Sequence, residues 1–550
     1  MGNSQTKTGE AGRKHNLPKP KPPKEKKRTE PKPRQVSAGG ILHENISMVD
    51  RIEDTRDIYD YYDKVKIIGE GSTCKVYAIQ KKKNSRHTAP ENSSKGVGVM
   101  EGTEQQLFAL KEISKDLLDD LFLKEMKNEI AILRRMDHPN IIKIYDMFES
   151  KRSVYMIMDY CSGGDLFSRI PYSEAEAARI MTKLLSAIAY MHSSKVVHRD
   201  IKCENVMFES GNSDSEVKVI DFGLSKRYIK ASKNYLMHCK VGTAYTMSPQ
   251  VIQGEYSSKA DTWSAGVVAF TLLSSTRPFD GETNQEIASK IINQEFDKDF
   301  QGEEWKQVSS DAKIFVASLL TYDENQRKSA PQALLSGWLK REFPLDKRRP
   351  DEQVMNRVQN ALIHSAKDSK FKKLAMSIIA YNSSEEDIEK LRGAFGQYDA
   401  NNNGTIVYFE FRKALAACNF SESELKRIFA SIDINHTGVI NYTEFLSATL
   451  ETRGRIEDER IAEAFDKLDT DDSGFISKEN ICMVLGSKCT AKECDNIINE
   501  LMEEIDADND GQISYKEFLS MFREKHRASV DEACCRVAEA ETGCGSQKCD

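Results

Sequence analysis

A repeat near the C-terminus constrains the fold of this chain more than any other feature of its sequence. Acidic loops begin at Asp399, Asp433, Asp469 and Asp506, at spacings of 34, 36 and 37 residues. Each loop has an isoleucine seven residues after its first aspartate, and large apolar side chains lie on both sides. Self-similarity at a fixed period indicates one structural unit that is repeated. We therefore expect four helix–loop–helix units in this part of the chain.

The four loops follow the pattern of the EF-hand, which binds calcium through oxygens at positions 1, 3, 5, 7, 9 and 12 and has glycine at position 6. The candidate ligands of the first, second and fourth loops are Asp399, Asn401, Asn403, Thr405 and Glu410; Asp433, Asn435, Thr437, Val439 and Glu444; and Asp506, Asp508, Asp510, Gln512 and Glu517. A single loop of this kind could be a solvated acidic turn, but four at near-even spacing favour calcium binding.

The loops differ in the number of carboxylates they offer. The third loop has the candidate ligands Asp469, Asp471, Ser473 and Phe475. Its position 12 is Asn480, so a bidentate carboxylate is lost and we expect weak binding or none. Loop four offers four carboxylates, and loops one and two offer two each. We expect loop four to bind calcium most tightly and the first pair to act as the trigger.

Small residues follow a strand-like stretch near the start of the chain, in the order Gly69-Glu-Gly71-Ser-Thr-Cys74-Lys-Val76. They would let backbone amides approach triphosphate oxygens. Cys74 stands where the third glycine of G-x-G-x-x-G would be, and a glycine-containing turn is the alternative. Further on, Lys111 ends a second strand and Glu129 lies on the helix that follows. This pair could orient the α- and β-phosphates, or could be a surface ion pair.

Two further motifs bring together the residue types that phosphoryl transfer needs. They are His198-Arg199-Asp200-Ile-Lys202-Cys-Glu204-Asn205 and Asp221-Phe222-Gly223. Asp200 can accept the proton of an attacking hydroxyl, whereas Asn205 and Asp221 can hold magnesium. With Lys111 and Glu129, these groups occur in the order that the chemistry requires. The sequence therefore predicts transfer of phosphate from ATP.

On these motifs, residues 62–339 resemble a eukaryotic protein kinase domain. Lys202, two places after Asp200, resembles the serine/threonine type rather than the tyrosine type. The resemblance implies that Asp159 and Cys161 belong to the hinge that binds adenine, with Met158 as gatekeeper. Glu204 and Asp165 match acidic positions that select an upstream arginine in basophilic kinases, with solvated acids as the alternative.

The sequence departs from the kinase pattern at two places. Cys74 replaces a flexible glycine, and the usual Ala-Pro-Glu motif is Ser248-Pro249-Gln250. Gln250 can keep a hydrogen bond to Arg327 but not the ion pair of a glutamate. The segment from Leu224 to Val241 has no acidic residue, so Ser232 is a candidate phosphorylation site that could pair with Arg199.

A basic, amphipathic segment joins the two halves of the chain. We expect a helical stretch over 351–379 that mixes lysines with apolar residues. Such a helix suits an acidic sensor, could also occupy the kinase cleft as a pseudosubstrate, or could be a linker. The whole arrangement resembles the calcium-dependent protein kinases of plants and protists. That resemblance implies a junction that inhibits at rest and is pulled away by calcium.

The N-terminus matches the myristoylation pattern, with Gly2 followed by Thr6. One myristoyl chain binds membrane only marginally, but ten Lys and Arg residues between Arg13 and Arg34 would add attraction to an anionic surface. The basic head has no aromatic interleaving, so we expect no nucleic-acid partner. No apolar run reaches the roughly 18 residues of a membrane span. The twelve cysteines form no zinc-type pair, which favours free thiols in a reducing cytosol.

The predicted fold class is α+β: a bilobal protein kinase fold followed by an all-α, calmodulin-like domain with two EF-hand pairs. The predicted divisions are a basic extension, the kinase, the autoinhibitory junction, the sensor and a polar cysteine-bearing tail, over residues 1–60, 61–339, 340–384, 385–525 and 526–550. We expect a monomeric, cytoplasmic and peripherally membrane-bound serine/threonine kinase that uses ATP, Mg²⁺ and Ca²⁺ and prefers basic contexts. The alternative is a calcium-responsive scaffold with little turnover.

Overall fold

The computed structural model describes residues 58–70, 74–82, 106–117, 120–228, 237–344, 350–416, 418, 420–453, 456–485, 498–499 and 501–523. These residues all lie within one compact unit, residues 38–550. The predictions for Gly2, the polybasic head, Gly71, Ser232 and the C-terminal cysteine-bearing tail fall outside the described residues. Within those residues, no helix has both the length and the apolar character that crossing a membrane requires.

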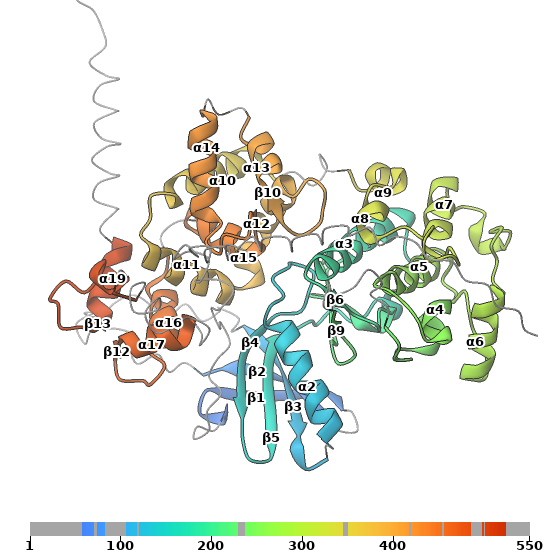
Figure 1. The fold of residues 1–550 in the computed structure, drawn as a ribbon, viewed down its shortest axis with the longest axis horizontal. Helices are drawn as coiled ribbons and strands as arrows, with labels where there is room; N and C mark the ends of the chain where they lie inside the picture. The colour runs from blue at the N-terminus through green and yellow to red at the C-terminus, as the bar shows by residue number, and fades with distance from the viewer. Residues whose placement is uncertain are drawn as a thin grey trace, which may run out of the picture. The chain divides into compact units, whose positions relative to one another are not determined.

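The first part of the described chain is an antiparallel sheet with the strand order β1-β2-β3-β5-β4. The strands are β1 (Tyr62–Glu70), β2 (Cys74–Lys81), β3 (Leu107–Ser114), β5 (Ser153–Asp159) and β4 (Ile144–Glu149). Helix α2 (Asp120–Leu133) lies beside this sheet (Figure 1). The register places Val76 opposite Lys111 on neighbouring strands, so the last residue of the small-residue motif lies next to the candidate phosphate-binding lysine.

The second part is mostly helical and is built around α5 (Lys259–Ser274), which is buried along nearly its whole length. A helix that is apolar on every side belongs in the centre of a core. The other helices are α3 (Glu174–Ser193), α4 (Pro249–Gln253), α6 (Asn284–Asn293), α7 (Ser310–Leu319), α8 (Ala330–Leu334) and α9 (Gly337–Glu342). Two short antiparallel ladders carry the catalytic motifs: β6 (Val196–Val197) with β9 (Lys226–Arg227), and β7 (Val206–Phe208) with β8 (Val217–Val219).

The C-terminal part contains the predicted helix–loop–helix repeats. Its helices are α12 (Glu385–Tyr398), α13 (Tyr408–Ala414), α14 (Glu422–Ile432), α15 (Tyr442–Thr449), α16 (Asp458–Leu468), α17 (Lys478–Leu485) and α19 (Tyr515–Arg523). Strand β10 (Ile406–Val407) pairs with β11 (Val439–Ile440), and β12 (Phe475–Ile476) pairs with β13 (Ile513–Ser514). The loops therefore couple two by two, and the α+β fold class with two EF-hand pairs is confirmed.

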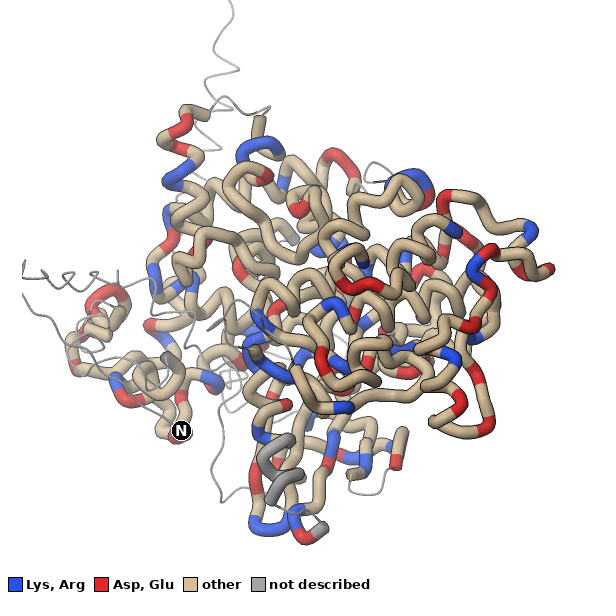
Figure 2. The backbone as a smooth tube through the Cα atoms, turned by 45° about the vertical axis from the view of Figure 1, so that its right-hand side comes forward, with Lys and Arg blue, Asp and Glu red and all other residues tan. Residues whose placement is uncertain are grey.

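The junction differs from the single helical stretch expected over 351–379. It forms two helices, α10 (Glu352–Ser365) and α11 (Lys370–Asn382). The break has a local cause: the Ser369 side chain accepts a hydrogen bond from the Lys372 amide and so begins a new helix. Figure 2 shows Lys and Arg interspersed with Asp and Glu along the described chain.

Helix α11 is buried among the helices of the EF-hand part. Its apolar side chains share one core with those of α15, α16 and α19; they include Phe371, Leu374, Ala375, Met376, Ile378 and Ile379. Two of its lysines also contact that part, since Lys372 Nζ donates to Glu451 at 2.6 Å and Lys373 Nζ donates to the Ser431 carbonyl at 3.1 Å. In this structure the junction is thus a ligand of the EF-hand domain.

Candidate active site and calcium sites

The predicted lysine–glutamate pair is formed between the sheet and helix α2. Lys111 Nζ on β3 lies 2.9 Å from a carboxylate oxygen of Glu129 on α2, and Glu129 is buried. Burial acts to lower the pKa of Lys111, but the nearby Glu129 and Asp221 carboxylates reverse this and the net shift is upward. Lys111 is therefore held as a cation, so the surface ion pair considered above is not what the structure shows.

Asp200 lies in a network of donors that keeps its carboxylate ionised and oriented. Lys202 Nζ lies 2.8 Å from one oxygen, which also accepts from the Asn205 amide at 2.9 Å. The other oxygen accepts from the backbone N–H and the hydroxyl of Thr243, at 3.0 and 2.7 Å. Burial raises the pKa of Asp200, but the donors from Lys202 and Thr243 outweigh it and the net shift is downward. Sequence analysis missed Thr243, which no catalytic motif contains.

The two candidate magnesium ligands lie on adjoining backbone segments. The Ile220 amide donates to the Asn205 carbonyl at 2.9 Å, which places Asn205 beside Asp221. Phe222 is fully buried and packs edge-on against His198, with ring centroids 4.8 Å apart. Asn205 lies next to the Asp200 carboxylate, and Asp221 lies near Lys111. An amide oxygen and a carboxylate are suitable ligands for a magnesium ion that keeps several waters and binds nucleotide. The residues present therefore fit Mg²⁺ and ATP.

A buried aspartate on α5 holds the catalytic loop in place, and sequence analysis missed it. Asp261 accepts from the backbone amides of His198 and Arg199 at 2.9 and 2.8 Å, and lies 2.8 Å from His192 Nε2. Burial raises the pKa of Asp261, but these partners outweigh it and lower the pKa overall. The sequence did contain a signal for this residue: an aspartate stands two residues before a tryptophan, at the start of an apolar helix.

The hinge residues adjoin the end of β5. The Asp159 side chain accepts from Lys218 Nζ at 2.7 Å and from the Tyr145 hydroxyl at 2.8 Å, so it faces the interior. The Asp159 backbone N–H donates to the Lys143 carbonyl at 3.2 Å. Cys161 is half-buried, and Gly69 on β1 pairs with Val76 on β2.

Gln250 forms the hydrogen bond expected in place of an ion pair. Arg327 Nη2 donates to Gln250 Oε1 at 2.7 Å, and its other nitrogens donate to the carbonyls of Lys259 and Thr321. Burial lowers the pKa of Arg327 to about 10. The guanidinium is satisfied by neutral acceptors, so the substitution leaves the local structure intact.

The EF-hand loops hold their first and last ligands through backbone amides. In loop one, Asp399 accepts from the Asn403 and Gly404 amides, and Glu410 accepts from those of Asn401 and Val407. Loop two repeats this pattern with Asp433 and Glu444. Burial raises the pKa of Glu444 to about 8. A buried carboxylate next to other oxygens is stabilised by a cation, so the residues of these loops fit calcium.

Loops three and four differ in what fills the loop. In loop four, oxygens of Asp506, Asp508 and Asp510 lie within 4.8 Å of one another, which is suited to a divalent cation. In loop three, Asn480 Nδ2 donates to Asp471 at 3.2 Å and to Thr470 at 2.8 Å. The NH₂ group of Asn480 is a donor, so this side chain cannot offer calcium the two oxygens of a glutamate. Weak binding at loop three stays a prediction, and this geometry supports it.

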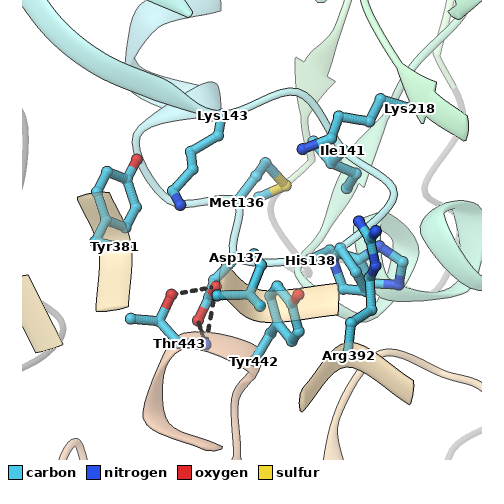
Figure 3. Close-up of a pocket in the computed structure, with 12 residues that line it drawn as sticks. Met136, Asp137, His138, Ile141, Lys143, Lys218, Tyr381, Arg392, Tyr442 and Thr443 are labelled. Atoms are coloured by element: carbon cyan, nitrogen blue, oxygen red, sulfur yellow. Dashed lines mark hydrogen bonds between the residues drawn. The ribbon is translucent and has the colours of Figure 1, made fainter. Parts of the chain in front are cut away.

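The kinase part contacts the junction and the EF-hand part through the segment between α2 and β4, through strand β4, and through Glu209 after β7. Asp137 accepts from the Thr443 amide at 2.9 Å and from the Thr443 hydroxyl at 2.7 Å (Figure 3). The Tyr381 hydroxyl donates to the Ile144 carbonyl at 2.6 Å, and Arg392 pairs with Glu209 at 2.9 Å. Thr443 immediately precedes the last ligand of loop two. Calcium geometry and kinase contact are therefore adjacent in the chain, a link that sequence analysis missed.

Comparison with known families agrees with this architecture. Residues 92–339 match the protein kinase domain, and residues 388–450 and 458–523 each match the EF-hand domain pair. The fold and the site thus define a protein serine/threonine kinase that uses ATP and Mg²⁺ and carries its own EF-hand sensor for Ca²⁺.

Relatives with both parts show the family. Calcium-dependent protein kinase 5 of Plasmodium falciparum (isolate 3D7) is 33% identical over 489 residues, which cover 86% of this chain and 83% of that protein. Calcium-dependent protein kinase 29 of Arabidopsis thaliana is 35% identical over 474 residues, 85% of this chain and 83% of that protein. The chain belongs to the calcium-dependent protein kinase family. It is a calcium-activated serine/threonine kinase, and the comparisons favour this over the scaffold alternative.

Proposed function

We propose that Asp200 accepts the proton of a substrate Ser or Thr hydroxyl as phosphate is transferred. The observation that carries this proposal is the set of donors from Lys202, Asn205 and Thr243 that holds the Asp200 carboxylate. ATP supplies the phosphoryl group, and magnesium neutralises charge that develops on it. Lys111, fixed by Glu129, orients the α- and β-phosphates, while Asn205 and Asp221 hold the metal.

The test is phosphate transfer from Mg-ATP to a basic serine peptide, in calcium and in chelator. We expect transfer only in calcium, and Asp221→Ala to abolish it. Glu112→Ala is the matched control, because Glu112 pairs with Lys64 on the far strand of the same sheet. Equal transfer in calcium and chelator would keep the kinase and discard the switch.

We propose that the junction inhibits the kinase at rest and that calcium transfers it to the EF-hand domain. Burial of the apolar face of α11 in that domain supports a captured, non-inhibitory position. Moving a population from 1:99 to 99:1 takes about 5.5 kcal/mol of differential binding. One site at 100 times its dissociation constant yields about 2.7 kcal/mol if the other state does not bind, so two switching sites suffice.

We propose the predicted domain boundaries and membrane attachment as well. Strands β1 and β2 precede the start of the family match at residue 92, which supports a kinase domain that begins near residue 61. Gly2 and the polybasic head are proposed to anchor the chain to an anionic membrane. Gly2→Ala should shift the protein from the membrane to the soluble fraction, whereas Gly9→Ala should not.

A further inference from the structure

Glu204, which matches an arginine-selecting position, already has an arginine of its own chain beside it. Arg277 Nη2 lies 3.3 Å from Glu204 Oε1. The Tyr245 hydroxyl donates to the same carboxylate, at 2.8 and 2.5 Å from its two oxygens. The carboxylate is thus occupied by an internal cation and an internal hydroxyl.

The guanidinium of Arg277 lies beside the Glu204 carboxylate and over two aromatic rings. Its guanidinium carbon lies 4.2 Å from the centroid of the Tyr245 ring and 5.2 Å from that of Phe167. A guanidinium over aromatic faces and next to a carboxylate combines cation–π attraction with a charge-assisted hydrogen bond. These are the interactions that would recognise arginine in a peptide.

The backbone that carries Arg277 is anchored, so this placement is built into the fold. Phe279, two residues further on, is fully buried and stacks on Trp263 with ring centroids 5.9 Å apart. Ser275, two residues before, ends α5 in the left-handed conformation with φ 59°. Because Arg277 is tethered this close to Glu204, a substrate arginine must compete with a group at high effective concentration.

The other candidate acid, Asp165, has a different environment in the described part of the chain. Asp165 accepts from the Ser168 amide at 2.8 Å. Among the residues that the structure describes, no Lys or Arg forms an ion pair with Asp165. The two acids are therefore not equivalent toward a basic peptide.

We propose that Arg277 is a specificity-determining residue that occupies the Glu204 position, so that the wild-type kinase selects a basic residue through Asp165 and not through Glu204. The inference rests on the proposed phosphorylation of Ser or Thr in basic contexts and narrows it. Substrates then need one upstream basic residue. If Asp165 and Glu204 were both available, they would select two.

The experiment measures kcat/KM of the full chain, in calcium and Mg-ATP, for peptides with one arginine scanned through the positions upstream of the serine. The variants are Arg277→Ala, Glu204→Ala and the double variant, with Lys290→Ala as control because Lys290 pairs with Glu286 on α6. A charge-assisted hydrogen bond contributes enough for about a tenfold effect. Arg277→Ala should therefore raise the preference for arginine over alanine about tenfold at one position, and the double variant should lose that gain.

Three results would overturn the inference. Arg277→Ala can leave the arginine profile unchanged, or Glu204→Ala can remove a strong arginine preference that the wild type already has. If wild type transfers phosphate to no peptide, the proposed function fails together with the inference, whereas the first two results leave that function intact. Arg277→Gln, which keeps the stem over the rings, replaces Arg277→Ala if the latter is misfolded by circular dichroism.

Discussion

At the scale of single residues, the active site depends on side chains that orient other side chains. Asp261 is fully buried on α5, and it accepts from the two amides that lead into Asp200. Thr243 acts on Asp200 directly, from the segment before α4. A buried carboxylate has no water to bond and depends on such donors. Removing either the donor or the carboxylate therefore leaves a buried polar group without a hydrogen-bond partner.

Asp261→Ala is expected to cost about 3 kcal/mol of folding free energy, because it removes the buried contact with His192 and leaves two buried amides without an acceptor. The midpoint of urea unfolding measures the free energy, and kcat should fall as the catalytic loop loosens. Asp311→Ala is the matched control, because Asp311 lies in an exposed pair and should change stability by about 0.5 kcal/mol or less. Equal unfolding midpoints for the two variants would contradict the assigned role.

At the scale of the element, the four EF-hand loops share one backbone geometry and differ in a few ligands. All four loop glycines adopt positive φ, between 81° and 86°, which any other residue would strain. The loops differ most at position 12. The carboxylates of Glu410 and Glu444 each accept hydrogen bonds from two backbone amides, whereas the Asn480 side chain donates one to Asp471.

Asn480→Glu is expected to create a working third site. The new carboxylate removes the amide donor from Asp471 and supplies the missing bidentate ligand, so calorimetry should find one more calcium per chain. Asn499→Glu adds the same charge outside the loops and should leave the stoichiometry unchanged. An unchanged stoichiometry in Asn480→Glu would show that something else limits the loop.

At the scale of the whole molecule, the EF-hand part contacts both the junction and the kinase. Helix α11 lies in its core, and Thr443 at the start of α15 bonds to Asp137 of the kinase. If the contacts differ between the resting and active states, docking on the kinase changes the calcium affinity by some factor. Calcium binding must then change the docking equilibrium by the same factor.

Replacing Glu410 and Glu444 together by glutamine is expected to abolish calcium activation, because both loops that we predict to be the trigger lose their bidentate ligand. Kinase activity against free calcium concentration gives the result. Glu422→Gln and Glu424→Gln together form the control, since both residues lie at the exposed start of α14. Activation that persists in the first variant would refute the assignment of loops one and two as the trigger.

Asp137→Ala is expected to raise the calcium concentration for half-maximal activity about fivefold, because it removes about 1 kcal/mol of contact that favours the docked sensor. Calcium titration of kinase activity measures the shift. Glu149→Ala removes an exposed pair with Lys115 on the same sheet and should leave the titration unchanged. The same curve for Asp137→Ala and wild type would show that the contact does not contribute to activation.

Local spacing alone determined the calcium loops, because the ligands of each loop lie within a dozen residues and short-range geometry brings them together. The catalytic motifs were recognised by their residue types and order along the chain, although Lys111, Asp200 and Asp221 lie far apart in it. The two-helix junction escaped prediction because Ser369 competes locally as a cap within an otherwise continuous amphipathic pattern. Only tertiary structure decided the partners that lie far apart in the chain: Thr243 with Asp200, 43 residues away, and Thr443 with Asp137, 306 residues away. It also decided that Glu204 faces Arg277, 73 residues further on. The sequence determines the charge of a side chain, but the packing of helices and strands determines which distant residue it contacts.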